Sequence, residues 1–255
     1  MEVTMNENIF DGVGETYAKY RPSYPQELLK YLCSEIGINK FSTIADIGSG
    51  TGILTRQLLN QCSKVYAIEP NDDMRKVAEK KLGNEFGFIS INGTAENTTL
   101  EKESIDYVTA AQSFHWFDRL SFKQECKRIL KPKGKVVLIW NSRDETSELV
   151  RKIDSINQKY CPNFSGSACG MRGAKSPNDF DDFFQQGYDV KCFQNDLIFT
   201  KERFIGLHLS ASYRLDTSDS NYSRYMGELI KVFDVYSNKG ILKMPNFTRS
   251  YAGTI

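Results

Sequence analysis

The chain has 255 residues, 40% hydrophobic and 25% charged, an ordinary length and balance for one elaborated α/β domain. Its formal net charge of +1 gives no electrostatic basis for binding nucleic acid or an acidic membrane surface. No apolar run is long enough to cross a bilayer, and residues 1–11 lack the pattern of a signal peptide, so a cytoplasmic location is expected.

The first part of the chain alternates between apolar strands and amphipathic helices. Residues 1–38 are expected to form a cap segment and a helix, because apolar residues recur at helical spacing from Leu28 to Ile36 and end at Gly37. Short apolar runs follow at 43–47, 65–68, 86–91, 105–110 and 136–140, and helical patterns separate most of them. This rhythm predicts a parallel sheet that helices cover on both faces.

The pattern changes after residue 160. Residues 161–177 are rich in Gly and Ser and predict a surface loop, of the kind that often serves as a lid or binding element. Residues 190–200 predict a strand of mixed polarity, and residues 222–233 form the clearest helical stripe of the chain. Residues 241–255 predict an antiparallel edge strand, with Pro245 at an edge or bulge.

The six cysteines are scattered and form no CxxC pair. Several fall within helical apolar patterns. Buried reduced thiols are therefore expected, rather than disulfides or a zinc site.

A glycine-rich turn follows the first predicted strand in Asp46-Ile-Gly-Ser-Gly-Thr-Gly52. Ligands of open parallel sheets bind where such a strand passes into a helix. The dinucleotide fingerprint needs a further glycine at position 53, which is Ile53. Asp46 can accept a hydrogen bond from an ammonium group or its water, and Glu69, which ends the second strand, can accept both hydroxyls of a ribose. A ligand with a ribose and a charged amino-acid tail, and without phosphate, fits these residues better than a nicotinamide dinucleotide.

With these motifs the sequence resembles the class I S-adenosylmethionine-dependent methyltransferases. Residues 46–52 look like their first motif, Ile68-Glu69-Pro70 like their second and Gly93-Thr94-Ala95-Glu96 like their third, and residues 129–135 are similar to the turn before their fifth strand. The resemblance implies a doubly wound, Rossmann-like, mostly parallel sheet of seven strands, the last of them antiparallel. It also implies S-adenosylmethionine as the cofactor and one domain over 1–255, with the cofactor-binding core in 39–142 and the substrate side and final strands in 143–255.

The resemblance assigns roles residue by residue. Gly48 and Gly50 would face the methionine part, Glu69 the ribose, Met74 one face of the adenine, and Thr94 to Glu96 its edge. Many relatives have Asp where this chain has Thr94, so the backbone N–H of Ala95 is the expected adenine contact there. The full set expected at the cofactor is Asp46, Gly48, Ser49, Gly50, Gly52, Glu69, Pro70, Met74, Thr94, Ala95, Glu96 and Gln112.

Two further segments, residues 20–25 (Tyr-Arg-Pro-Ser-Tyr-Pro) and 115–118 (His-Trp-Phe-Asp), look like the trans-aconitate methyltransferase group and its small-molecule relatives. The implied partner is a small-molecule methyl acceptor. Arginines suit an acidic acceptor, since guanidinium matches carboxylate bidentately, although each arginine has an ordinary surface role as its alternative. The residues expected on the substrate side are Tyr20, Arg21, Tyr24, Trp116, Arg143 and Arg172.

His115 follows the fourth strand, at the carboxyl edge of the sheet beside the expected donor site. An imidazole there can act as a general base, line the pocket or pack against the next helix, and the sequence leaves all three roles open. His208 lies between Leu207 and Leu209 in a predicted helix and is expected to be structural.

The leading hypothesis is in-line methyl transfer from S-adenosylmethionine to a small molecule, with carboxylates among the candidate acceptors. A nicotinamide-dependent oxidoreductase and a non-catalytic S-adenosylmethionine-binding regulator are the alternatives. The Asn-Pro-Pro-aromatic signature of amino-group methylation is absent at residues 110–113, which disfavours methylation of DNA bases and glutamine.

Overall fold

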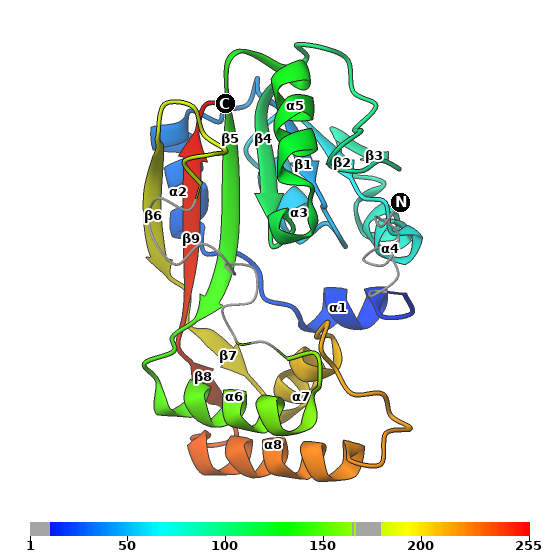
Figure 1. Ribbon diagram of the computed structural model, residues 1–255, viewed down its shortest axis with the longest axis vertical. Coiled ribbons are helices and arrows are strands. Elements are labelled where there is room, and N and C mark those ends of the chain that lie inside the picture. The colour runs from blue at the N-terminus through cyan, green and yellow to red at the C-terminus, as the bar shows by residue number, and fades with distance from the viewer. Residues whose placement is uncertain (1–10, 165, 167–179) are drawn as a thin grey trace.

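A computed structural model describes residues 11–164, 166 and 180–255. Its main element is a seven-stranded sheet in the order β3-β2-β1-β4-β5-β9-β6 (Figure 1). The first five strands run parallel to one another, and β9 is antiparallel to both β5 and β6. The strands of this sheet are β1 (Thr43–Ile47), β2 (Lys64–Ile68), β3 (Phe88–Ile91), β4 (Ile105–Ala111), β5 (Leu130–Arg143), β6 (Tyr188–Gln194) and β9 (Asn246–Gly253). The predicted fold class, including the antiparallel last strand, is confirmed.

Helices cover both faces of the sheet because its central strands are apolar on both sides. In β5, Val136, Leu138 and Trp140 belong to the core under α5 (Arg119–Ile129), whereas Val137 and Ile139 belong to the core on the opposite face. Side chains of a strand point to alternate faces, so a continuous apolar run supplies both cores. The opposite face is covered by α2 (Gln26–Tyr31), the π-helix η3 (Leu32–Ile36) and α3 (Ile53–Leu59).

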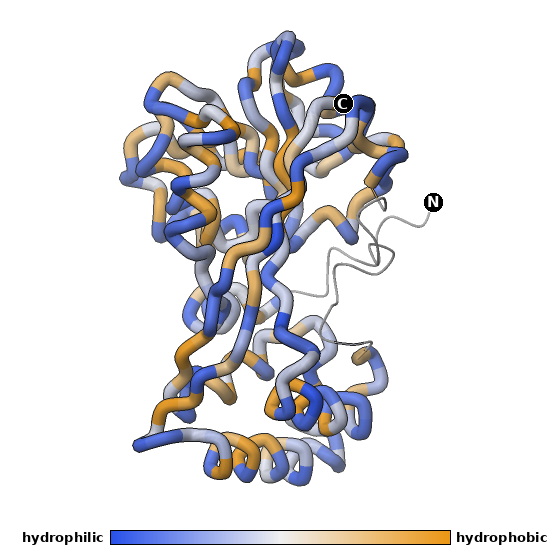
Figure 2. The backbone as a smooth tube through the Cα atoms, turned by 90° about the vertical axis from the view of Figure 1, so that its left-hand side faces the viewer, coloured by the Kyte–Doolittle hydropathy of each residue, from blue (hydrophilic) through white to orange (hydrophobic). Residues whose placement is uncertain are grey.

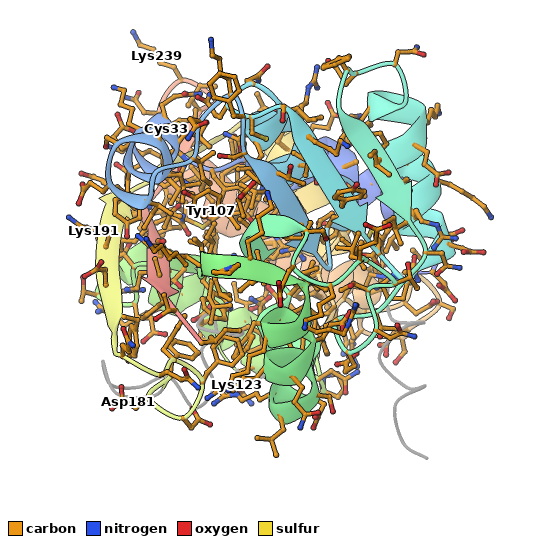
Figure 3. All side chains as sticks on the ribbon, turned by 90° about the horizontal axis from the view of Figure 1, so that it is seen from above. Cys33, Tyr107, Lys123, Asp181, Lys191 and Lys239 are labelled. Atoms are coloured by element: carbon orange, nitrogen blue, oxygen red, sulfur yellow. The ribbon has the colours of Figure 1, made fainter. Side chains whose placement is uncertain are left out.

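The N-terminal helices are fixed to the sheet at several points. The helix predicted to stop at Gly37 does so, with Gly37 at φ 103°, and the Tyr107 hydroxyl of β4 contacts this turn by donating to Ile36 O at 3.4 Å. On the outside, Lys191 of β6 pairs with Glu35 of η3 at 2.7 Å. The view from above shows Lys191 at the periphery and Tyr107 in the interior (Figure 3).

A second, smaller core lies below the sheet. It is formed by α6 (Glu148–Tyr160), α7 (Lys201–Leu209), α8 (Tyr222–Tyr236) and the two-stranded sheet of β7 (Leu197–Phe199) and β8 (Leu242–Met244). Phe204, Leu229 and Phe233 are fully buried there, and Tyr225 of α8 donates to Asn157 of α6 at 2.9 Å. Figure 2 shows this lower lobe joined to the upper part by the ends of long strands.

The short helix α1 (Gly14–Tyr20) connects the two parts. Its Tyr20 hydroxyl donates to Glu202 of α7 at 2.9 Å, and the Tyr20 ring lies directly on Gly206 of the same helix. On the other side Glu15 pairs with Lys80 of α4 (Asp72–Leu82) at 2.8 Å. Because exposed ion pairs contribute little, the Tyr20–Gly206 packing is the main contact of α1 with the lower lobe.

Two predicted elements are wrong in their details. The strand expected over 190–200 is two strands, β6 and β7, in different sheets, because the chain turns away at Asn195 and Asp196. The final segment is likewise divided at Pro245 into β8 and β9. β9 is not an edge strand: it lies between β5 and β6, and β6 forms the edge.

Five cysteines lie within the described residues, and all five are free; Cys62, Cys126 and Cys161 are buried as expected, Cys33 is partly exposed and Cys192 is exposed. Over this same part of the chain, no cluster of His, Cys, Asp or Glu is arranged to hold a metal ion. None of its helices combines the length and apolarity needed to span a membrane.

Candidate functional site

The glycine turn connects β1 to α3 at the carboxyl edge of the sheet. Gly48 has φ 63°, and a Cβ on it would lie 2.6 Å from Ser113 Cβ, so only glycine allows the β1 and β4 ends to approach this closely. Gly50 has φ 57°, and a Cβ added to it would meet no atom within 4 Å, so its backbone borders open space. A Cβ on Gly52 would lie 2.6 Å from Leu82 of α4, which places this glycine at a helix contact.

Asp46 lies at the end of β1 and is almost completely buried. Its two carboxylate oxygens accept hydrogen bonds from Thr55 Oγ1 at 2.6 Å and Thr109 Oγ1 at 2.8 Å. Burial raises the pKa of Asp46 to about 6, even though both hydroxyl groups favour the ionised form. Asp46 is therefore mostly ionised at neutral pH, and a cation beside it would stabilise the ionised form.

Glu69 follows β2 and is oriented by the backbone. Oε2 accepts from Gly50 N at 2.8 Å and Oε1 accepts from Asn71 N at 2.9 Å. Burial raises the pKa of Glu69, and these two backbone donors oppose the shift. A carboxylate has about four acceptor positions, so each oxygen retains capacity for one more donor.

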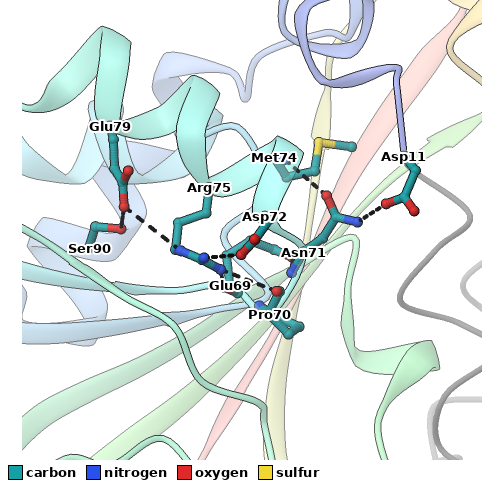
Figure 4. A network of polar contacts seen from close by, with 9 residues as sticks. All are labelled: Asp11, Glu69, Pro70, Asn71, Asp72, Met74, Arg75, Glu79 and Ser90. Carbon is teal, nitrogen blue, oxygen red and sulfur yellow. Dashed lines mark hydrogen bonds and ion pairs between the residues drawn. The ribbon is translucent and has the colours of Figure 1, made fainter.

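The start of α4 holds the segment after Glu69 in place (Figure 4). Asn71 caps the helix, because its Oδ1 accepts from Met74 N at 3.0 Å, and its Nδ2 donates to Asp11 at 2.8 Å. Arg75 donates to the carbonyl oxygens of Glu69 at 2.9 Å and Pro70 at 3.2 Å and also pairs with Asp72. Residues 69–71 are therefore a fixed rim beside the glycine turn.

These elements surround a cleft, defined here by its lining residues: Tyr17, Tyr24, Asp46, Gly48, Ser49, Gly50, Thr51, Ile53, Leu54, Glu69, Pro70, Asn71, Met74, Thr94, Ala95, Glu96, Ala111, Gln112, Ser113, Trp116 and Phe117. Of the twelve residues expected at the cofactor, all except Gly52 line this cleft. Gly52 faces Leu82 instead, so its role is the close packing of α3 against α4.

A second cavity, the side chamber, adjoins the cleft. Its lining residues are Tyr17, Arg21, Pro22, Tyr24, Ile53, Gln112, His115, Trp116, Asn141, Arg143, Gly166, Leu197, Leu207, Ser212, Tyr213, Met244 and Asn246. Five of them also line the cleft: Tyr17, Tyr24, Ile53, Gln112 and Trp116. The two cavities are thus neighbours with a common wall.

The two cavities differ in charge. Three acidic residues, Asp46, Glu69 and Glu96, line the cleft, and none of its lining residues in the described part of the chain is basic. Two basic residues, Arg21 and Arg143, line the side chamber, and no Asp or Glu is among its lining residues within the described chain. The cleft therefore favours a cationic ligand and the side chamber an anionic one.

The expected substrate residues are only partly brought together. Arg21, Tyr24, Trp116 and Arg143 line the side chamber, and so does His115. Tyr20 lies outside both cavities, because its ring packs on Gly206 and its hydroxyl binds Glu202. Arg172 and most of the predicted loop 161–177 lie outside the described residues.

The two arginines are held by the lower lobe. Arg21 donates to Ser210 O at 2.8 Å and lies over the Tyr17 ring, with 4.8 Å from Cζ to the ring centroid. Arg143 pairs with Asp154 at 3.5 Å. His208 of α7 is buried and donates from Nδ1 to Phe204 O at 2.9 Å. Burial, together with the charges of both arginines, lowers its pKa to about 3, so its ring is neutral.

Several residues that line the two cavities are not among those predicted from the sequence. Asn71, Ser113 and Phe117 line the cleft, and Asn141 lines the side chamber. Ser113 follows β4 and Asn141 lies near the end of β5, at the same edge of the sheet as Asp46. A search of every carboxyl strand end would have identified both.

The mostly parallel seven-stranded sheet with its antiparallel strand is the class I methyltransferase fold. Residues 45–138, which include this turn and the Glu69 rim, match the family model described as a methyltransferase domain.

The chain is also similar to individual proteins along part of its length. An uncharacterized methyltransferase of Schizosaccharomyces pombe is 36% identical over 144 residues, which is 56% of this chain and 56% of that protein. An uncharacterized methyltransferase of Mycobacterium tuberculosis is 35% identical over 140 residues, which is 55% of each. The chain thus matches these relatives over about half of their length.

Solved structures extend the likeness to most of the chain. A candidate type II methyltransferase from Anaeromyxobacter dehalogenans has a TM-score of 0.63 at 19% identity, and the match covers 92% of this chain and 98% of that protein's chain. The YcgJ protein from Bacillus subtilis has a TM-score of 0.57 at 13% identity, and the match covers 91% of this chain and 100% of that protein's chain. At these identities the likeness concerns the fold.

Proposed function

We propose that this chain is an S-adenosylmethionine-dependent methyltransferase that methylates a small molecule, with carboxylates as the favoured acceptor class. The observation that carries the proposal is Glu69, a residue of the cleft wall whose two oxygens each accept one backbone N–H and each have capacity for one more donor. This arrangement suits the two hydroxyls of a ribose. The match of residues 45–138 to a methyltransferase domain supports the same cofactor.

The other cleft residues fit the rest of that cofactor. The open side of Gly50 leaves room for the methionine part, and Asp46 provides the carboxylate for its ammonium group. Met74 is buried at the wall of the cleft and offers an apolar face to the adenine, whose edge would meet Thr94, Ala95 and Glu96. When bound, S-adenosylmethionine supplies an electrophilic methyl group on a positively charged sulfur.

The side chamber supports the choice of acceptor. It lies across a common wall from the cleft, so an acceptor in it would be next to the methyl donor. Arg21 and Arg143 provide positive charge there, and guanidinium is the best side-chain partner for a carboxylate. The near-neutral net charge of the chain supports a small acceptor over a nucleic acid.

In this proposal the residues act mainly by alignment and by excluding water. Well-placed reactants can lower a barrier by roughly 7–11 kcal/mol without a dedicated base, and an ionised carboxylate acceptor needs none. Tyr17, Tyr24 and Trp116 lie at the common wall, where aromatic faces suit a sulfonium. His115 lies in the side chamber and would take the proton of an acceptor that carries one.

The segments that resemble the trans-aconitate methyltransferase group support extending the proposal to that group. Arg21, Pro22 and Tyr24 from the first segment and His115 and Trp116 from the second all line the side chamber. We propose that this chamber, completed by residues after 143 such as Leu207 and Asn246, is the substrate side of the enzyme.

The alternatives are less well supported. A nicotinamide dinucleotide needs backbone access where the side chain of Ile53 borders the cleft. A regulator without activity would be favoured by an acceptor pocket filled with side chains, whereas a lined cavity adjoins the cleft.

The test is a methyl-transfer screen of small carboxylic acids, phenols and amines with labelled S-adenosylmethionine. Turnover centred on carboxylic acids is expected. Turnover of amines alone would contradict the acceptor class, and cofactor binding without any turnover would favour the regulator.

A further inference from the structure

Asn141 lies near the end of β5, on the wall of the side chamber, and its amide is held in one orientation. Thr248 is its direct partner in the β5–β9 register, and Thr248 Oγ1 donates to Asn141 Oδ1 at 2.5 Å. Asn195 Nδ2 donates to the same oxygen at 3.2 Å and to Thr248 Oγ1 at 3.1 Å. A carbonyl oxygen accepts two hydrogen bonds, so the acceptor side of the Asn141 amide is already satisfied.

The donor side of the Asn141 amide, its Nδ2 group, remains available for a ligand. Asn141 Nδ2 has no hydrogen-bond partner among the described residues, although asparagines that serve structure usually bond their own N–H groups as well. The backbone beside it is also fixed, because Gln112 Nε2 donates to Asn141 O at 2.9 Å. Gln112 itself has φ 59°, an uncommon conformation for a residue with a side chain, and lines both cavities.

The supports of this amide come from distant parts of the chain. Thr248 is completely buried, and the backbone N–H of Asn195 donates to Asn246 O at 2.8 Å. Rotation of the Asn141 amide would lose both bonds to Oδ1 and place its N–H groups against the Nδ2 donor of Asn195. The side chamber therefore has a preorganised N–H donor beside its two arginines.

We propose that Asn141 is a specificity-determining residue that donates from Nδ2 to a carbonyl or carboxylate oxygen of the methyl acceptor and so orients it toward the cleft. This inference rests on the proposed function, because it takes the side chamber as the acceptor site. In this proposal the hydrogen bonds among Asn141, Thr248 and Asn195, in addition to the charge of the two arginines, select an acceptor that carries a carbonyl or carboxylate oxygen.

The central variant is Asn141→Asp, which has the same shape and keeps an oxygen for Thr248 and Asn195 but replaces the Nδ2 donor by a negative oxygen. Asn60→Asp is the matched control. Asn60 is exposed at the end of α3 and lines neither cavity, so this substitution adds the same negative charge away from both of them. Thr248→Val is the second variant: it leaves the lining of the side chamber unchanged and removes the hydroxyl that orients the amide.

Benzoate is the probe, titrated by calorimetry into protein loaded with S-adenosylhomocysteine, whose own affinity is measured first. Asn141→Asp is expected to weaken benzoate binding by at least about tenfold, and Thr248→Val by about threefold, since a charge-assisted hydrogen bond is lost or misaligned. Asn60→Asp is expected to match the parent. S-adenosylhomocysteine should bind all four proteins equally.

The outcomes separate the two proposals. If S-adenosylhomocysteine does not bind the parent, the proposed function fails. If it binds but benzoate does not, or if benzoate binds Asn141→Asp as tightly as the parent, the role of Asn141 is refuted while the cofactor site stands.

Discussion

Asp46 gives the sharpest pH-dependent prediction. Burial raises the pKa of its carboxyl group to about 6, against an ordinary value of 3.8. Between these two pH values the folded protein holds a proton on Asp46 that the unfolded chain releases. The contribution of Asp46 to stability therefore decreases as the pH rises through this window. Within residues 11–164, 166 and 180–255, the partners of this carboxylate are hydroxyl groups and not cations.

The ammonium group of the cofactor would be such a cation, so it should bind the ionised form of Asp46. At about pH 5, one unit below a pKa of about 6, roughly one carboxyl in eleven is ionised, whereas nearly all are ionised at about pH 7.5. Cofactor affinity should then fall about tenfold over this range, which is about 1.4 kcal/mol. Asp46→Asn keeps the shape and the contact with Thr55 but removes the titration, so its affinity should be low and independent of pH.

The assay is calorimetric titration of S-adenosylhomocysteine into the parent and Asp46→Asn at both pH values, with folding checked by circular dichroism. An equal affinity of the parent at the two pH values would refute the role of Asp46 as the ammonium partner. A tenfold pH effect that survives in Asp46→Asn would assign the titration to another group.

Three further predictions concern the rim, the α1 contact and the side chamber. Glu69→Gln should weaken cofactor binding by about 100-fold or more in calorimetry. The amide N–H₂ of Gln would face one of the two backbone N–H donors, and the charged acceptor for the ribose would be lost. An affinity within threefold of the parent would exclude Glu69 from the ribose site. Gly206→Ala should lower the free energy of unfolding by about 1–3 kcal/mol in thermal unfolding, because its Cβ would lie 2.3 Å from the Tyr20 ring. The control is Gly227→Ala in α8, where a Cβ would meet no atom within 4 Å, and it should be neutral or stabilising. Equal melting temperatures of the two variants would contradict the packing of Tyr20 on Gly206. His115→Ala should lower methyl transfer more than cofactor affinity, and unchanged turnover would exclude His115 as a base.

The sequence was sufficient for the parallel core because that core depends on local signals. The strands around Asp46 and Glu69 are short apolar runs, and the glycine turn between β1 and α3 requires residues that the sequence displays. Eleven of the twelve expected cofactor residues meet in one cleft for the same reason, since they follow consecutive strands at one edge of the sheet.

The rest depends on contacts between distant segments, which no local pattern records. The break at Asn195 that separates β6 from β7 is set by pairing with β9, and Asn141 gains its orientation from Thr248, 107 residues further along the chain. Tyr20 is predicted as a substrate residue because it belongs to the segment 20–25 that resembles the trans-aconitate methyltransferase group. Its position was decided by Gly206, which leaves space for its ring on α7.

The cofactor is tested directly by two calorimetric titrations of the parent protein, one with S-adenosylmethionine and one with NADH. We expect saturable binding of S-adenosylmethionine with one site per chain and no binding of NADH, because Glu69 and Asp46 suit a ribose with an ammonium tail and Ile53 occupies the place of the third glycine. Binding of NADH alone would contradict this expectation.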